Sequence, residues 1–168
     1  MIDDTPLESF LKQKQWLRAD LVTADPINQM IEAQKSQNQS SFNLFCEQLR
    51  LLNQLWEHYS EGRFGFKVQQ QIWQEIELEA GDLGEKFAQF GQRVGWCTQA
   101  QWLRYHHNAI VDSDKQGYFP LFVWFDSYYD QGSEGTYMGI GWRQAGTVLT
   151  PNPHRAQVLF SAIEACQL

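Results

Sequence analysis

Apolar side chains recur at helical spacing over most of the first 110 positions of this 168-residue chain. The clearest case is Leu44 to Ser60, where aromatic and aliphatic side chains step by three or four residues along one face and predict an amphipathic helix. Gly62 then predicts its end. The same period predicts shorter helices over residues 5–14, 68–78, 86–92 and 98–106.

The Asp25-Pro26 pair predicts a boundary between two helices. Proline disfavours helical backbone at the residue before it, and it can open a new helix that the preceding aspartate caps. We therefore expect a helix that starts near Trp16 to end at this pair, and a second helix to follow and to end before Lys35. The polar run from Ser36 to Ser41 predicts a short solvated loop.

The pattern changes after Val111. Gly117 to Phe125 concentrates aromatic side chains without a helical or strand period, and Tyr128 to Gly135 is punctuated by glycine. A long loop of this kind inside a helical domain is uncommon and is usually functional. Asn152 and Pro153 then predict the start of a last helix. The whole chain, residues 1–168, is thus predicted to be a compact, all-α, multi-helix single domain with a long aromatic loop before its last helix.

Composition and charge exclude several classes of protein. Acidic residues outnumber basic ones by 20 to 13, which gives a net charge of -7 and disfavours a nucleic-acid partner. The chain contains no apolar run that could span a bilayer, and its acidic start is unlike a signal peptide, so we expect an intracellular protein without a membrane span. Cys46, Cys97 and Cys166 form no C-x-x-C pair, so we expect buried small side chains, not disulfides or a zinc site.

Motifs for catalysis are weak. No nucleophile elbow, Walker loop or dinucleotide fingerprint is present. His106 and His107 are adjacent and point about 100° apart on a helix, so they cannot easily share one metal ion, although one histidine could serve as an axial ligand to a metallated ring. Glu75, Glu77 and Glu79 predict a solvated acidic face. We expect no enzyme, and a small enzyme that uses either histidine is the minor alternative.

The aromatic content, with 7 Trp, 11 Phe and 6 Tyr, needs two explanations. Aromatics on regular helix faces predict an ordinary core. Those in or beside the loops, around Phe64, Trp96 and from Phe119 to Tyr129, could form an exposed binding patch. They could equally fold back as a satellite core beneath the loop.

The motif Tyr-Ser-x-Gly-Arg-Phe-Gly-Phe-x-Val-Gln, from Tyr59 to Gln69, is long and unusual in composition. Together with Phe90-Gly91-Gln92-Arg93-Val94-Gly95-Trp96, it resembles the Genomes-uncoupled-four tetrapyrrole-binding family, which assists magnesium chelatase in oxygenic phototrophs. The match is strongest over residues 16–120. Residues 121–150 form a divergent loop where the family has its ligand loop, and residues 151–168 resemble its C-terminal helix. Departures from the family pattern occur at Asn53, Tyr118, Phe119 and Ala162.

The resemblance implies an all-α domain shaped like a cupped hand, whose aromatic palm holds protoporphyrin IX or Mg-protoporphyrin IX. It implies a non-enzymatic regulator of chlorophyll biosynthesis that stimulates magnesium chelatase, with the large porphyrin-binding subunit of the chelatase as a partner. The location would be the cyanobacterial cytoplasm or the plastid stroma, with peripheral membrane contact. The alternative is a divergent paralogue that binds haem, a bilin or a protein partner and does not act on the chelatase. The expected ligand-binding residues are aromatic faces and basic rim groups: Arg63, Phe64, Phe66, Arg93, Trp96, Trp102, Arg104, Phe119, Phe122, Trp124 and Arg143.

Overall fold

Helices build this fold, as the hydrophobic pattern predicts. The computed structural model describes residues 5–34, 39–76, 82–98, 101–102, 113–128 and 148–168. Its α-helices are α1 (Thr5–Lys12), α2 (Trp16–Gln34), α3 (Gln39–Tyr59), α4 (Phe66–Gln74), α5 (Leu83–Val94) and α6 (Pro153–Ala165). A 3-10 helix, η1 (Phe122–Trp124), and two short strand pairs, β1 (Cys97–Thr98) with β2 (Gln101–Trp102) and β3 (Phe125–Tyr128) with β4 (Val148–Pro151), complete the described part. The all-α class is therefore confirmed.

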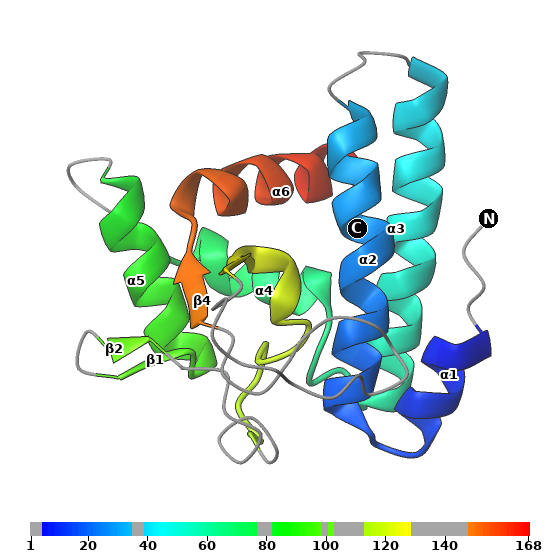
Figure 1. Ribbon diagram of the computed structural model, residues 1–168, viewed down its shortest axis with the longest axis horizontal. Coiled ribbons are helices and arrows are strands. Elements are labelled where there is room, and N and C mark those ends of the chain that lie inside the picture. The colour runs from blue at the N-terminus through cyan, green and yellow to red at the C-terminus, as the bar shows by residue number, and fades with distance from the viewer. Residues whose placement is uncertain (1–4, 35–38, 77–81, 99–100, 103–112, 129–147) are drawn as a thin grey trace.

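The two longest helices, α2 and α3, run side by side, and α1 packs against both at one end of this pair. The shorter helices α4, α5 and α6 contact one another beside the pair, and α6 crosses above α4 in the view of Figure 1. The antiparallel pairing of β3 with β4 joins the chain that follows η1 to the chain that enters α6. The residues just before and just after 129–147 are therefore hydrogen-bonded to each other.

The expected helix boundary at Asp25-Pro26 is wrong, because α2 continues through Pro26 without a break. Proline removes one helical hydrogen bond, but tertiary contacts on either side of it compensate. Thr23, one turn earlier, accepts a hydrogen bond from the Trp56 indole Nε1 at 3.0 Å, and Ile27, one residue later, is fully buried. The buried face thus spans the proline and holds one long helix together.

The prediction of a helix over residues 98–106 is also wrong for the first part of this range, which contributes to the β1–β2 hairpin instead. Residues 103–106 lie outside the described residues. Trp102 lies against Gly91 of α5, where an added Cβ would come within 2.6 Å of the indole ring, and it stacks on Phe87 at a centroid distance of 5.1 Å. This packing, which needs the chain to turn back over α5, overrides the helical spacing of the aromatic side chains.

Other helix ends differ from expectation by a few residues. Helix α3 begins at Gln39, inside the run expected to be a loop, and α4 begins at Phe66. Helix α5 begins at Leu83 because the Asp82 side chain caps it, accepting hydrogen bonds from the backbone N–H groups of Gly84 and Glu85. The last helix starts where the sequence predicts, with Asn152 as its cap.

The cysteines are buried as expected, but the expectation that they form no disulfide is wrong. Cys46 on α3 and Cys166 at the end of α6 are joined by a disulfide, across a sequence separation of 120 residues. Cys97 is buried and is not part of a disulfide. No local motif marks a pair so far apart, and the packing of α6 near α3 is what brings the two side chains together.

Candidate functional site

The most characteristic motif of the sequence folds as a tight turn between α3 and α4, residues 60–66, which we call the signature turn. The Ser60 Oγ accepts a hydrogen bond from the Phe64 backbone N–H at 2.9 Å and closes the turn. Gly65, with φ at +128°, caps α4 in a backbone conformation that side chains disfavour. The Asn53 Oδ1 accepts from the Lys67 N–H at 2.9 Å and so fixes the first turn of α4 against α3.

The signature turn and the two helices that flank it hold a second stretch of chain, residues 117–121, which we call the anchored segment. Gln69 of α4 is the main contact: its Nε2 donates to the carbonyl oxygens of Gly117 and Pro120, each at 2.8 Å. Its Oε1 accepts from the Trp124 indole Nε1 at 3.1 Å. Because Gln69 is fully buried, these bonds form where water cannot compete for them.

Four further hydrogen bonds hold the anchored segment by its backbone. The signature turn supplies two of them, from the Gly65 N–H to the Phe119 carbonyl at 3.0 Å and from the Gly117 N–H to the Arg63 carbonyl at 2.9 Å. The Trp96 indole donates to the Tyr118 carbonyl at 2.8 Å. The buried Asp20 carboxylate of α2 accepts from the Leu121 N–H at 2.8 Å. Two helices, the signature turn and Trp96, which follows α5, therefore fix the stretch of chain that leads into the divergent region.

Five of the aromatic residues expected to face a ligand belong to the core instead: Phe64, Phe66, Trp96, Phe119 and Trp124 are 0–1% exposed. Phe119 stacks on Trp56 at 5.8 Å and meets Phe64 edge-on at 5.3 Å. Trp124 stacks on Phe160 of α6 at 4.4 Å. The expectation that these five rings present faces to a ligand is corrected, because other side chains already cover them. These residues are part of the main hydrophobic cluster, so they form neither an exposed patch nor a separate satellite core.

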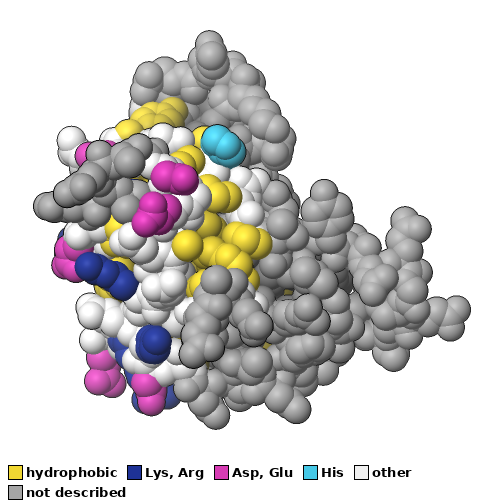
Figure 2. Space-filling view, turned by 90° about the vertical axis from the view of Figure 1, so that its left-hand side faces the viewer, with side chains coloured by type: hydrophobic (Ala, Val, Ile, Leu, Met, Phe, Trp, Pro, Cys, Tyr) yellow, Lys and Arg dark blue, Asp and Glu magenta, His cyan; other side chains and the backbone are white. Residues whose placement is uncertain are grey.

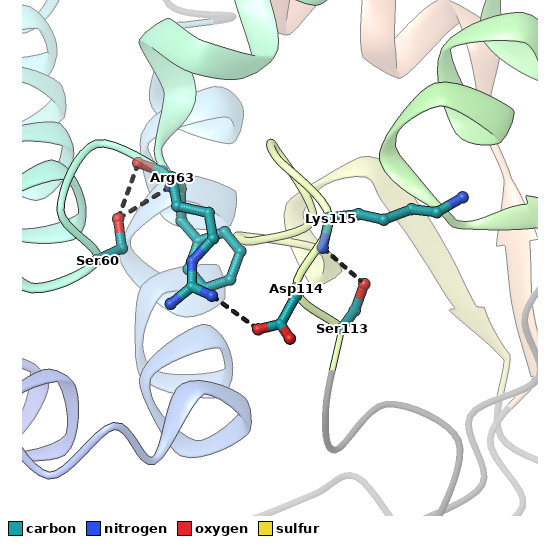
Figure 3. A network of polar contacts seen from close by, with 6 residues as sticks. Ser60, Arg63, Ser113, Asp114 and Lys115 are labelled. Atoms are coloured by element: carbon teal, nitrogen blue, oxygen red, sulfur yellow. Dashed lines mark hydrogen bonds and ion pairs between the residues drawn. The ribbon is translucent and has the colours of Figure 1, made fainter.

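Arg63 is the basic candidate that the signature turn presents at the surface (Figure 3). Its Nη1 lies 2.7 Å from Asp114 Oδ1, and its guanidinium lies 4.9 Å from the centre of the Phe64 ring. The side chain of Asp114 is 94% exposed, so this ion pair contributes little to stability. Lys115 points away from this pair, towards α5. Arg63 is thus held in one orientation with a partner that another anion could replace at low cost.

The remaining candidates are spread over other surfaces or lie outside the described residues. Arg93 of α5 forms an ion pair with Glu75 at 2.9 Å. Trp102 is partly buried against Phe87. On the face that α5 lines, hydrophobic side chains lie in the open between acidic and basic ones (Figure 2). Arg104 and Arg143, as well as the side chain of Phe122, are outside what the structure describes.

The described residues contain no group of three or more His, Cys, Asp or Glu side chains that could hold a metal ion. His58 and His154 are exposed. His106 and His107 are outside the described residues. A hollow of about 510 Å³ lies between α4, α5 and α6, and its wall includes Trp73, Lys86 and Glu164.

Tyr118, which the sequence motifs do not mark as a ligand-binding residue, has a buried hydroxyl group. Its side chain is 2% exposed, and its hydroxyl has no hydrogen-bond partner among the described residues. Burial, and to a lesser degree the negative charge of Asp20, raises the pKa of Tyr118 well above its usual value of 10.0. The phenol is therefore held in its neutral form throughout the ordinary pH range, inside the anchored segment.

Replacing Tyr118 with phenylalanine tests this state. Deprotonation above pH 10 is open to the tyrosine in the unfolded chain but not in the folded one, so alkaline pH favours unfolding. We expect the free energy of unfolding of the parent protein to fall, relative to Tyr118→Phe, by about 1.4 kcal/mol per pH unit above pH 10. At pH 8 the variant should be at least as stable, since it lacks the unsatisfied hydroxyl. Urea unfolding at pH 8, 10 and 11 measures both effects, and parallel pH profiles would contradict the expectation.

No helix in the described part of the chain is long and apolar enough to cross a bilayer.

Comparison with known proteins agrees with this architecture. The family model described as GUN4-like matches residues 1–129. The chain is 30% identical over 126 residues to the Ycf53-like protein of Synechocystis sp., which covers 71% of this chain and 51% of that protein. It is also 30% identical over 126 residues to the uncharacterized protein ycf53 of Porphyra purpurea, which covers 71% of this chain and 50% of that one. The chain thus spans about half the length of these curated relatives.

The ligand-free structure of Arabidopsis thaliana GUN4 has a similar fold, with a TM-score of 0.52 at 24% identity over 70% of this chain and 80% of that one. The family match includes α1 to α5, the signature turn and the anchored segment, and it ends just after β3. On this match, the chain belongs to the GUN4-like family.

Proposed function

We propose that this protein is a non-enzymatic, tetrapyrrole-binding regulator, which binds protoporphyrin IX or Mg-protoporphyrin IX and stimulates magnesium chelatase in chlorophyll biosynthesis. Membership of the GUN4-like family carries the proposal, since the family match includes the signature turn and everything that anchors residues 117–121. The large subunit of the chelatase is the proposed protein partner. A cytoplasmic or stromal location with peripheral membrane contact belongs to the same proposal.

Because five of the aromatic candidates are buried, other groups would hold the ligand. A porphyrin is a flat apolar disc with two carboxylates, so it needs apolar surface and basic groups at its rim. The five buried rings cannot stack on it, and we assign them the task of fixing the anchored segment. Arg63, Arg93 and Trp102 remain proposed ligand contacts within the described part, and Arg104, Phe122 and Arg143 remain proposed contacts beyond it.

Arg63 is the sharpest test of this arrangement. A propionate can accept hydrogen bonds from the guanidinium in place of Asp114, and this exchange costs little because the existing pair is exposed. We expect Arg63→Gln to weaken protoporphyrin binding about five- to tenfold, from an affinity on the order of micromolar. We expect Asp114→Asn to strengthen it about two- to threefold, since it removes the competing carboxylate. Titration followed by Soret absorbance measures both affinities.

Arg18 supplies the matched control. Its guanidinium also lies over an aromatic ring, that of Phe10 at 5.7 Å, on an exposed part of α2. Arg18→Gln should leave protoporphyrin affinity unchanged. If the parent protein shows no saturable Soret change at tens of micromolar ligand, the proposed function is wrong; if all variants bind equally, the function stands and the role of Arg63 is wrong.

The second candidate function is that of a divergent relative that binds haem, a bilin or a protein partner without acting on the chelatase. The end of the family match at residue 129 favours it, because the chain beyond this point has no counterpart in that match. A chelatase assay separates the two candidates, since the first predicts faster metal insertion when the protein is added and the second predicts no change.

A further inference from the structure

The disulfide between Cys46 and Cys166 joins two elements that sequence order keeps far apart. Cys166 directly follows the last residue of α6, and Cys46 lies on α3. Arg50, one turn along α3 from Cys46, donates from Nη2 to the Cys166 carbonyl oxygen at 2.5 Å. The C-terminal end of α6 is therefore attached to α3 by one covalent bond and one charge-assisted hydrogen bond.

The rest of α6 is held independently of this disulfide. In its middle, Phe160 stacks on Trp73 of α4 at 4.5 Å and on Trp124 at 4.4 Å. Near its start, Arg155 donates from Nε to the Val123 carbonyl at 2.6 Å and from Nη2 to the Asn28 side chain of α2. Cleavage of the disulfide would thus remove the covalent attachment of one end of α6 and leave the remainder docked, so the bond can break without global unfolding.

We propose that this disulfide is a redox-controlled clamp, which a dithiol reductant opens to release the last turn of α6 from α3. The proposal does not depend on any ligand of the protein. Opening of the clamp would change the shape of the hollow between α4, α5 and α6, because Ser161 and Glu164 in its wall lie within five residues of Cys166. Release of the last turn frees this side of the hollow to move.

The exchange follows ordinary thiol–disulfide chemistry. A thiolate of the reductant attacks the sulfur of Cys46, a residue that is 6% exposed against 0% for Cys166. The S–S bond breaks and Cys166 leaves as a thiolate, whose charge the Arg50 guanidinium attached to the same residue stabilises. The second thiol of the reductant then displaces Cys46. Two protons end on the two protein sulfurs, and the reductant is oxidised to its own disulfide.

Thiol counting under native conditions tests the clamp, with the Cys97→Ala variant used throughout so that the third cysteine does not contribute. The air-oxidised protein should show no reactive thiol, and dithiothreitol without denaturant should reveal two. Because the cross-link closes a loop of about 120 residues, reduction should lower the Tm by about 5–15 °C. Hydrogen exchange should rise in the last turn of α6 and stay unchanged at its Arg155 end.

Two further variants complete the test. Cys46→Ala combined with Cys166→Ala should have the Tm of the reduced protein and show no response to dithiothreitol. Arg50→Gln should slow reduction several-fold, and Arg50→Lys, which keeps the positive charge, should restore most of the rate. The proposal is overturned if the air-oxidised protein already shows two reactive thiols, or if the disulfide is reduced only in denaturant. It is also overturned if hydrogen exchange rises evenly over the whole protein on reduction.

Discussion

Replacement of Gln69 with leucine should lower the free energy of unfolding by about 3 kcal/mol. Leucine matches the glutamine in size but removes both donated hydrogen bonds to the anchored segment and the one accepted from Trp124. The Gly117 carbonyl then remains buried with its glutamine donor gone, and each buried group left unsatisfied costs about 1–3 kcal/mol. Urea unfolding followed by far-UV circular dichroism measures the loss.

Gln71, two residues further along α4, is exposed and provides the matched control. Gln71→Leu changes helix composition and hydrophobicity in the same way, and it should shift stability by less than about 0.5 kcal/mol. Equal effects of the two substitutions would mean that the anchoring bonds add nothing beyond helix propensity. A large effect at Gln69 alone supports the anchored segment as a structural unit.

Gly65→Ala should be as damaging as the loss of Gln69, with a cost of about 3–4 kcal/mol. A non-glycine residue at φ +128° is strained by roughly 1–3 kcal/mol, and the new Cβ would lie 2.9 Å from Asn53 Oδ1. Asn53 cannot simply move aside, because that oxygen accepts the hydrogen bond from the Lys67 N–H at the start of α4. We therefore expect both a lower Tm and a frayed first turn of α4.

A Gly62→Ala variant separates the effect of backbone strain from the effect of steric contact at Gly65. Gly62 too has a positive φ, +76°, but a Cβ there would meet no atom within 4 Å. Gly62→Ala should cost only about 1–2 kcal/mol, which is the price of the left-handed conformation. If both alanine variants lose the same stability, the close approach between the signature turn and α3 is not what requires glycine at position 65.

The helices of this protein are largely predictable from sequence, because their apolar spacing survives in the fold. The face that contains Phe45, Leu49, Leu52 and Trp56 is buried along α3, as the period of three and four residues predicts. The cap at Asn152 and the glycine stop at Gly62 also match their predicted places. These features depend on residues close together in the chain, so local rules are sufficient to find them.

Features that depend on distant partners were beyond local rules. Pro26 lies within a continuous helix because the buried face of α2 packs across it, and Trp102 enters a hairpin because Gly91 offers space for its ring. The disulfide joins residues 120 positions apart. Among the site candidates, position in a loop predicts exposure for Phe64 and Phe119, but both side chains are buried in the core. One signal was available in advance: glutamine at position 69, within the signature motif on an otherwise apolar helix face, indicates a buried polar role.

The hydrogen bonds that Gln69, Trp96, Asp20, Trp124 and the signature turn form with residues 117–121 end on backbone atoms of those residues. Bonds to main-chain atoms do not depend on the sequence of the chain that follows, so this later chain can vary while its starting point stays fixed. The fold thus provides a fixed attachment point from which loops of different sequence can extend. Chimeras that carry the corresponding loop of a relative between residues 121 and 152 should fold, and ligand preference should travel with the insert.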